Sequence, residues 1–320
     1  MTAQPADIAK AGRLCPHDYR YAPSVFRRPP EITAEVLYMV GGLYGNLAAL
    51  DAVEGLAAAE RVPPTIVFNG DFHWFDAEPA WFAEVARRVG RHRAIRGNVE
   101  TEIARSRDIG VGCGCAYPPS VEDDVVRRSN EILRELRETA SAVPGASEHL
   151  AGLAMHCVAR VGDLTVGIVH GDATSLAGWG FAHDAFDQAA LERLDDIRHQ
   201  SAVDVFASTH TCLATLRDLA LPGGRLMIVN NGAAGMPNFV GTRFGLVSRI
   251  AARPSPVGPL YGVTRGNVHI DALALRYDHA AFLSRFLARW PAGSAAHASY
   301  FRRIDCGPDY RLDSAWRQAA

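Results

Sequence analysis

Four short apolar segments of the sequence are each followed, within three residues, by a side chain that can bind a metal ion. The four polar residues are Asp71, Asn98, His170 and His210. Each apolar segment has the length and composition of a buried β-strand. In α/β sheets, ligands bind beyond the carboxyl ends of the strands, where residues far apart in sequence meet. The pattern therefore predicts an α/β fold with a polar site at the strand ends.

The segments around these residues have the periodicity of strands and helices. A strand predicted over 36–40 is followed by a glycine turn and by a helix with Asn46 as its N-cap. The strand predicted over 65–68 precedes a helix whose first turn contains Pro79. Two further strands within 155–169, joined at Gly162 and Asp163, predict a hairpin.

The chain is expected to form one main folded unit with two flanking segments. Residues 1–34 are rich in proline and polar groups and lack periodicity, which predicts an extended N-terminal arm. Residues 35–285 contain the strands and helices of the main domain. Residues 286–320 are expected to be a C-terminal extension packed on that domain.

Composition limits the classes of partner. Among 320 residues, 33 basic and 35 acidic side chains leave a formal charge of -2, so no overall field would collect nucleic acid or an anionic membrane. No apolar segment approaches the roughly 18 residues of a membrane span, and the first residues have no apolar run of signal-peptide length. We therefore expect a cytoplasmic protein whose six cysteines are reduced.

The order of the motifs resembles that of the calcineurin-like metallophosphoesterase superfamily. The family pattern SDxHGN, GD, GNHD, HG, GHTH and NPGS corresponds to VGGLYGNLAAL, FNGDF, RGNVE, VHGD, STHTC and VNNGAAG in this chain. The resemblance implies a four-layer α-β-β-α sandwich with mixed sheets. It also implies a hydrolase-type, metal-binding protein, since the family cleaves phosphomonoesters or phosphodiesters at a dinuclear metal centre.

Departures from the family pattern fall on one of the two metal positions. In the family, Asp and His of the opening motif and the last His of GHTH hold the first metal, and here these are Gly42, Tyr44 and Cys212. All the ligands of the second metal are present, and they are the four strand-end residues Asp71, Asn98, His170 and His210. The resemblance therefore implies that one metal site has been lost and the other retained.

The resemblance also implies altered chemistry. Val99 stands where the family has the His that assists phosphate chemistry, and Glu100 stands where its Asp partner would be. A single ion still acidifies a bound water and polarises a substrate oxygen, but it lacks the clamp of two metals. The sequence assigns no catalytic residue beyond the metal ligands.

The retained ligand set suits a divalent Zn, Fe or Mn ion, without a choice among them, and supports one metal site better than two. Cys212 is a further candidate ligand that would favour softer metals, or else a buried inert thiol. Tyr44 is interpreted as a filler of the vacated space and Asp76 as a helix N-cap, and His73 is left unassigned. The pair Cys113 and Cys115 has either a metal or redox role or none.

Three functions remain open at this stage. The first is a divergent metallophosphoesterase that hydrolyses a phosphoester or related small anionic substrate through one metal. The second is a catalytically silent protein of the same fold that binds an anion or a partner. The third is a metalloenzyme with redox or lyase chemistry at Cys212.

The aromatic and basic stretch 300–303 is too short to indicate nucleic-acid binding, and we expect it at a partner or domain-edge contact. The sequence does not predict an oligomeric state.

Overall fold

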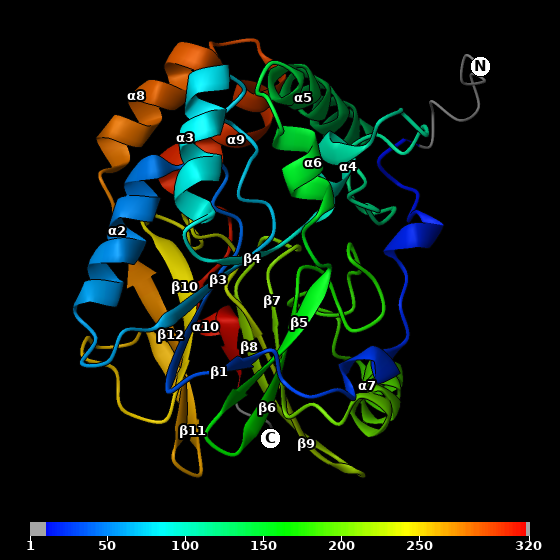
Figure 1. Ribbon diagram of the computed structural model, residues 1–320, viewed down its shortest axis with the longest axis vertical. Coiled ribbons are helices and arrows are strands. Elements are labelled where there is room, and N and C mark those ends of the chain that lie inside the picture. The colour runs from blue at the N-terminus through cyan, green and yellow to red at the C-terminus, as the bar shows by residue number, and fades with distance from the viewer. Residues whose placement is uncertain (1–10, 318–320) are drawn as a thin grey trace.

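Two mixed β-sheets pack face to face in the computed structural model, which describes residues 11–317, and helices cover their outer faces (Figure 1). One sheet has six strands in the order β11-β12-β10-β2-β3-β4. The other has seven strands in the order β1-β5-β6-β7-β9-β8-β13. The predicted four-layer α-β-β-α sandwich with mixed sheets is confirmed.

Within each sheet, the strands that lead to the predicted ligands run parallel to one another. In the six-stranded sheet, β3 pairs in parallel with β2 and with β4. In the seven-stranded sheet, β7 pairs in parallel with β6 and with β9. The strands of the six-stranded sheet are β2 (Val36–Val40), β3 (Thr65–Asn69), β4 (Arg93–Ile95), β10 (Gly245–Ala251), β11 (Tyr261–Arg265) and β12 (Val268–Leu275). Those of the seven-stranded sheet are β1 (Ile32–Thr33), β5 (His156–Val161), β6 (Leu164–Val169), β7 (Val205–Ser208), β8 (Thr215–Leu221), β9 (Gly224–Asn230) and β13 (Trp316–Arg317).

Most helices lie outside the two sheets, on the six-stranded side (Figure 1), whereas Ala315 of the short helix α10 (Leu312–Ala315) joins the apolar layer between the sheets. The other helices are α2 (Leu47–Ala58), α3 (Pro79–Val89), α4 (Asn98–Ala104), α5 (Asp123–Ser141), α6 (Ala146–Ala151), α7 (Gln188–Ser201), α8 (His279–Arg289) and α9 (Ala295–Cys306). Helix α7 covers the seven-stranded sheet together with the 3-10 turn Pro23–Phe26. No helix within residues 11–317 has the length and apolar character needed to cross a lipid bilayer.

Three apolar layers hold the four structural layers together, and β2 shows why its sequence is apolar throughout. Val36, Tyr38 and Val40 face the helices, whereas Leu37 and Met39 face the other sheet. Successive side chains of a strand point to opposite faces, so a strand covered on both faces needs apolar residues at every position.

Several local predictions hold and one is wrong. Asn46 caps α2 by accepting a hydrogen bond from the Ala49 amide, and Pro79 begins α3. The N-cap of α3 is Glu78, not Asp76. The Asp76 carboxylate instead accepts hydrogen bonds from His73 and from the Trp74 amide, in the loop before the helix. A carboxylate three residues before the first helical residue can bond within its own loop, and sequence does not distinguish this use from an N-cap.

The two flanking segments make specific contacts with the main domain. Tyr19 and Phe26 of the N-terminal segment are buried, and β1 adds a parallel strand beside β5. In the C-terminal segment, Ala296 and Ile304 of α9 join the apolar layer on the outer side of the six-stranded sheet.

A buried ion pair crosses the six-stranded sheet at Arg249. Its guanidinium lies 2.6 Å from Glu60 and 3.1 Å from Asp271, and its side chain is fully buried. We expect Arg249→Met to lower the free energy of unfolding by about 3–5 kcal/mol, because it leaves two carboxylates buried without their cation. Urea unfolding measures the effect. The control is Arg243→Met, which removes an exposed pair with Asp305 and should cost under about 1 kcal/mol. Equal losses in the two variants would contradict this assignment.

Candidate metal centre

The four residues predicted as ligands come together where four strands end. Asp71 follows β3, Asn98 begins α4 just after β4, His170 follows β6 and His210 follows β7. Ligand atoms of Asp71, His170 and His210 all lie within 4.8 Å of one another. His170 and Asn98 are fully buried, and Asp71 and His210 are each 6% exposed.

The side-chain atoms that meet at the centre are close enough to share one ion. His170 Nε2 lies 3.0 Å from Asn98 Oδ1, 3.0 Å from His210 Nδ1 and 3.4 Å from Asp71 Oδ1. The two strands of one sheet therefore contribute a carboxylate and an amide, and the two strands of the other contribute the imidazoles. The site exists only because the sheets face each other.

Backbone carbonyls fix the direction of three of these side chains. His170 Nδ1 lies 2.9 Å from the Asn69 carbonyl, His210 Nε2 lies 3.1 Å from the Cys115 carbonyl, and Asn98 Nδ2 donates to the Cys113 carbonyl over 2.9 Å. A carbonyl oxygen only accepts hydrogen bonds, so each outer nitrogen must carry the proton. The inner atoms, His170 Nε2, His210 Nδ1 and Asn98 Oδ1, are then lone-pair acceptors.

Burial keeps these acceptors without protons. It lowers the pKa of His170 to about 4 and that of His210 to about 3, so both imidazoles are neutral near pH 7. Burial also raises the pKa of Asp71 to about 7, against its usual acidic range. Lone pairs that face one another with no hydrogen between them repel, and a cation at the centre removes that repulsion. Two imidazoles, a carboxylate and an amide oxygen fit Zn, Fe or Mn.

The backbone at Asp71 is held in an uncommon conformation. Asp71 has a φ of 53° and follows Gly70, whose φ is 94°. A side chain at Gly97 would lie 2.4 Å from Asp71 Oδ1, so only glycine allows this approach between the two strand ends. Strained backbone of this kind is concentrated at functional sites.

Glu100 holds that strained loop through its carboxylate. Its Oε2 accepts hydrogen bonds from the amides of Asp71 and Gly97 at 2.9 and 2.8 Å, and its Oε1 accepts from Phe72 at 3.0 Å. A fourth amide, of His73, donates to Oε1 over 3.3 Å. Burial, with the nearby Asp71 charge, raises the pKa of Glu100. The sequence placed Glu100 only as the replacement of a family Asp. Its bond to the Gly97 amide is the local contact of a capping box, whereas its bonds to the amides of Asp71, Phe72 and His73 follow no local pattern.

Tyr44 and Cys212 belong to the two motifs in which the sequence has other residues where the resembled family has histidines. Tyr44 is buried, with its hydroxyl 2.9 Å from the Cys212 sulfur, and a side chain at Gly42 would lie 3.0 Å from the Tyr44 ring. Cys212 is outside the group of ligand atoms that lie within 4.8 Å of one another among the described residues. Its predicted role as a metal ligand stays a prediction.

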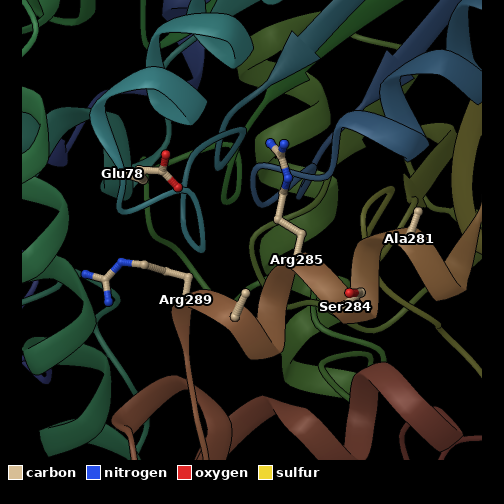
Figure 2. A pocket seen from close by; sticks show the side chains of 6 residues that line it. Glu78, Ala281, Ser284, Arg285 and Arg289 are labelled. Carbon is tan, nitrogen blue, oxygen red and sulfur yellow. The ribbon is translucent and has the colours of Figure 1, made fainter.

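The remaining residues singled out in the sequence lie outside the cluster of ligand atoms. Cys113 and Cys115 are buried free thiols, and the Cys115 sulfur lies 3.4 Å from Asn98 Nδ2. Their carbonyls orient Asn98 and His210, a role that cysteine spacing does not predict. His73 is buried, bonds to Asp76 and stacks on Phe82. A separate surface pocket, lined in part by Glu78, Arg285 and Arg289, contains none of the predicted ligands (Figure 2).

The fold has known counterparts although the sequence has none. No protein-family model matches the chain, and no curated protein matches it in sequence. A crystal structure of a metallophosphoesterase from Sphaerobacter thermophilus covers 86% of this chain and 100% of its own, with 17% identity and a TM-score of 0.51. The hypothetical protein PH1004 from Pyrococcus horikoshii OT3 covers 87% and 100%, with 15% identity and a TM-score of 0.53.

The chain has the fold of the Sphaerobacter thermophilus metallophosphoesterase structure. Within this fold, Asp71, His170 and His210 form a group that could bind a metal ion. The Val99 side chain, in place of the family's His, is buried beside the cluster, with its amide 3.4 Å from Asp71 Oδ1.

Glu100→Gln tests whether the loop around Asp71 depends on this carboxylate. An amide presents one NH2 group to N–H donors, so we expect at least two of the four hydrogen bonds to be lost and metal affinity to fall about 10–100-fold. Competition with a chelating dye measures the affinity. Glu102→Gln is the control, since Glu102 is also a buried carboxylate of α4 but bonds to Tyr19 and Arg105. A similar loss of affinity in both variants would assign the effect to helix α4 as a whole.

The geometry predicts one metal ion per chain. Elemental analysis of protein loaded with Zn, Mn or Fe and then dialysed should give a ratio of about one, because only one set of ligands is gathered among the described residues. His210→Ala should retain little of that metal. A ratio near two would show that Tyr44, Cys212 or other groups rebuild the second position.

Proposed function

We propose that the chain is a metal-dependent hydrolase that cleaves a phosphoester or a related small anionic substrate at one metal ion. Asp71, Asn98, His170 and His210 would hold the ion. The observation that supports this proposal is the inward convergence of their four acceptor atoms, with every outer nitrogen bonded to a carbonyl. A structural cluster of buried polar groups would pair donors with acceptors instead.

The chain's own residues prepare the centre for this chemistry. When bound, a divalent ion polarises a phosphoryl oxygen and lowers the pKa of water. The two imidazoles and the amide are neutral, so within the ligand set only the Asp71 carboxylate offsets the charge of the ion. The nearly complete burial of the ligands excludes bulk water, which strengthens electrostatic interactions with a bound anion.

Val99 defines the kind of ester that this centre would favour. A valine cannot give a proton to the leaving oxygen, a role that positioned acids perform in phosphoester cleavage. Esters whose leaving group is stable as an anion, such as aryl phosphates, need that proton least. We therefore propose aryl or similarly activated phosphoesters as the best substrates.

Turnover by the metal-loaded protein tests the proposal. A panel of aryl and alkyl phosphomonoesters and phosphodiesters should reveal metal-dependent hydrolysis that falls about 100-fold or more in His170→Ala. His183→Ala is the control, since His183 lies beside Tyr310 and away from the cluster, and it should retain full activity. Absence of turnover with Zn, Mn and Fe in fully loaded protein would refute hydrolysis and favour a silent, anion-binding protein.

A further inference from the structure

Helix α9 brings Arg303 against the loop that carries the altered ligand position. Arg303 Nη2 donates to the Cys212 carbonyl over 2.6 Å, and its Nε donates to the Pro237 carbonyl over 3.3 Å. Both partners are neutral backbone groups. Arg303 is half-buried, so its guanidinium reaches from the surface toward the interior of the site.

No carboxylate pairs with Arg303 within the part of the chain that the structure describes. Two other arginines differ in this respect. Arg249 bonds to Glu60 and Asp271, and Arg105 bonds to Asp18 and Glu102. The guanidinium of Arg303 therefore retains an uncompensated positive charge, with Nη1 free of any hydrogen bond within residues 11–317.

That charge lies next to the position where the family's motifs would supply ligands to another metal. The Cys212 sulfur lies 2.9 Å from the Tyr44 hydroxyl, and the Tyr44 amide donates to the Asp71 carbonyl over 3.1 Å. Short contacts therefore link Arg303 to the cluster, from its guanidinium to Cys212, from Cys212 to Tyr44 and from Tyr44 to Asp71.

The charges around the centre explain why a fixed cation is needed there. A divalent ion at the cluster would be balanced by the carboxylates of Asp71 and Glu100 when both are ionised, which leaves no excess charge to attract an anion. Arg303 adds one positive charge to this group. Guanidinium is permanently charged and binds phosphate oxygens in pairs, as a planar fork.

We infer that Arg303 forms, with the Tyr44 hydroxyl, a phosphate-binding subsite that takes the electrostatic place of the absent second metal. The ligand class is a phosphoryl group, either of a bound phosphoester or of inorganic phosphate as the hydrolysis product. This inference rests on the proposed function for the identity of the anion. It also gives the aromatic and basic stretch of α9 a specific role at the site.

Phosphate binding to metal-loaded protein tests the subsite without any need for turnover. We expect inorganic phosphate, titrated in a calorimeter, to bind Arg303→Met at least about tenfold more weakly than the native chain, because a charge-assisted pair of hydrogen bonds is lost. Arg302→Met is the matched control, since Arg302 is the exposed neighbour on the same helix, and its phosphate affinity should equal that of the native chain. Metal content is measured for each variant.

A conservative variant keeps the test decisive if Arg303→Met loses metal or does not fold. Arg303→Lys retains the charge but not the fork, and we expect it to bind phosphate several-fold more weakly than the native chain. Native affinity in a fully metal-loaded Arg303→Met or Arg303→Lys variant would overturn the inference, as would a native chain that does not bind phosphate.

The two proposals fail in different ways. Phosphate binding that depends on Arg303, without turnover of any ester, would support the subsite and refute hydrolysis. Turnover with phosphate binding that is independent of Arg303 would support hydrolysis and overturn the subsite.

Discussion

Three backbone carbonyls determine what the centre of this protein can do. The carbonyls of Asn69, Cys113 and Cys115 accept the outer N–H groups of His170, Asn98 and His210. Each of these side chains is thereby turned so that its lone pair faces inward. Orienting contacts of this kind fix the tautomer and direction of metal-binding histidines in other proteins. Without them the same residues could pair with one another, and no electron-rich centre would form.

The N-terminal segment supports the loop that provides two of those carbonyls. The Tyr19 hydroxyl donates to Glu102 of α4 over 2.6 Å, and a side chain at Gly114 would lie 2.4 Å from that hydroxyl. The Cys113 amide donates to Asn130 of α5 over 2.9 Å. The loop is thus fixed between helices and the N-terminal segment. This explains how a glycine-rich loop can fix the orientation of the Asn98 and His210 side chains.

Three residues around the centre share an uncommon backbone conformation and differ in side-chain chemistry. Tyr44, Asp71 and Cys212 all have a positive φ, which non-glycine residues rarely adopt. Asp71 retains a carboxylate at such a turn, whereas Tyr44 and Cys212 meet each other across the altered position. The same backbone conformation therefore presents a carboxylate at Asp71 and a phenol and a thiol at the other two positions. Arg303 is the cation that contacts Cys212, through its backbone carbonyl.

The sequence by itself determined the strand ends and the polar residues at them. Apolar runs and their turns are local features, so the ends of β3, β4, β6 and β7, the cap at Asn46 and the hairpin at Gly162 were predictable. The strand β10 was not predicted, because Ser248 and Arg249 interrupt its apolar pattern, and Arg249 is buried through ion pairs with residues distant in sequence.

Only the tertiary structure decided the roles of Glu100, the Cys113 and Cys115 carbonyls, and Arg303. Glu100 meets amides nearly thirty positions earlier in the chain, and Arg303 meets Cys212 across 91 positions. Every residue has a backbone carbonyl, so residue type does not reveal which carbonyls orient a ligand. Contacts between residues so far apart in sequence depend on how the sheets and helices pack. Local pattern thus places the ligands at the centre, whereas packing decides their direction and the charge beside them.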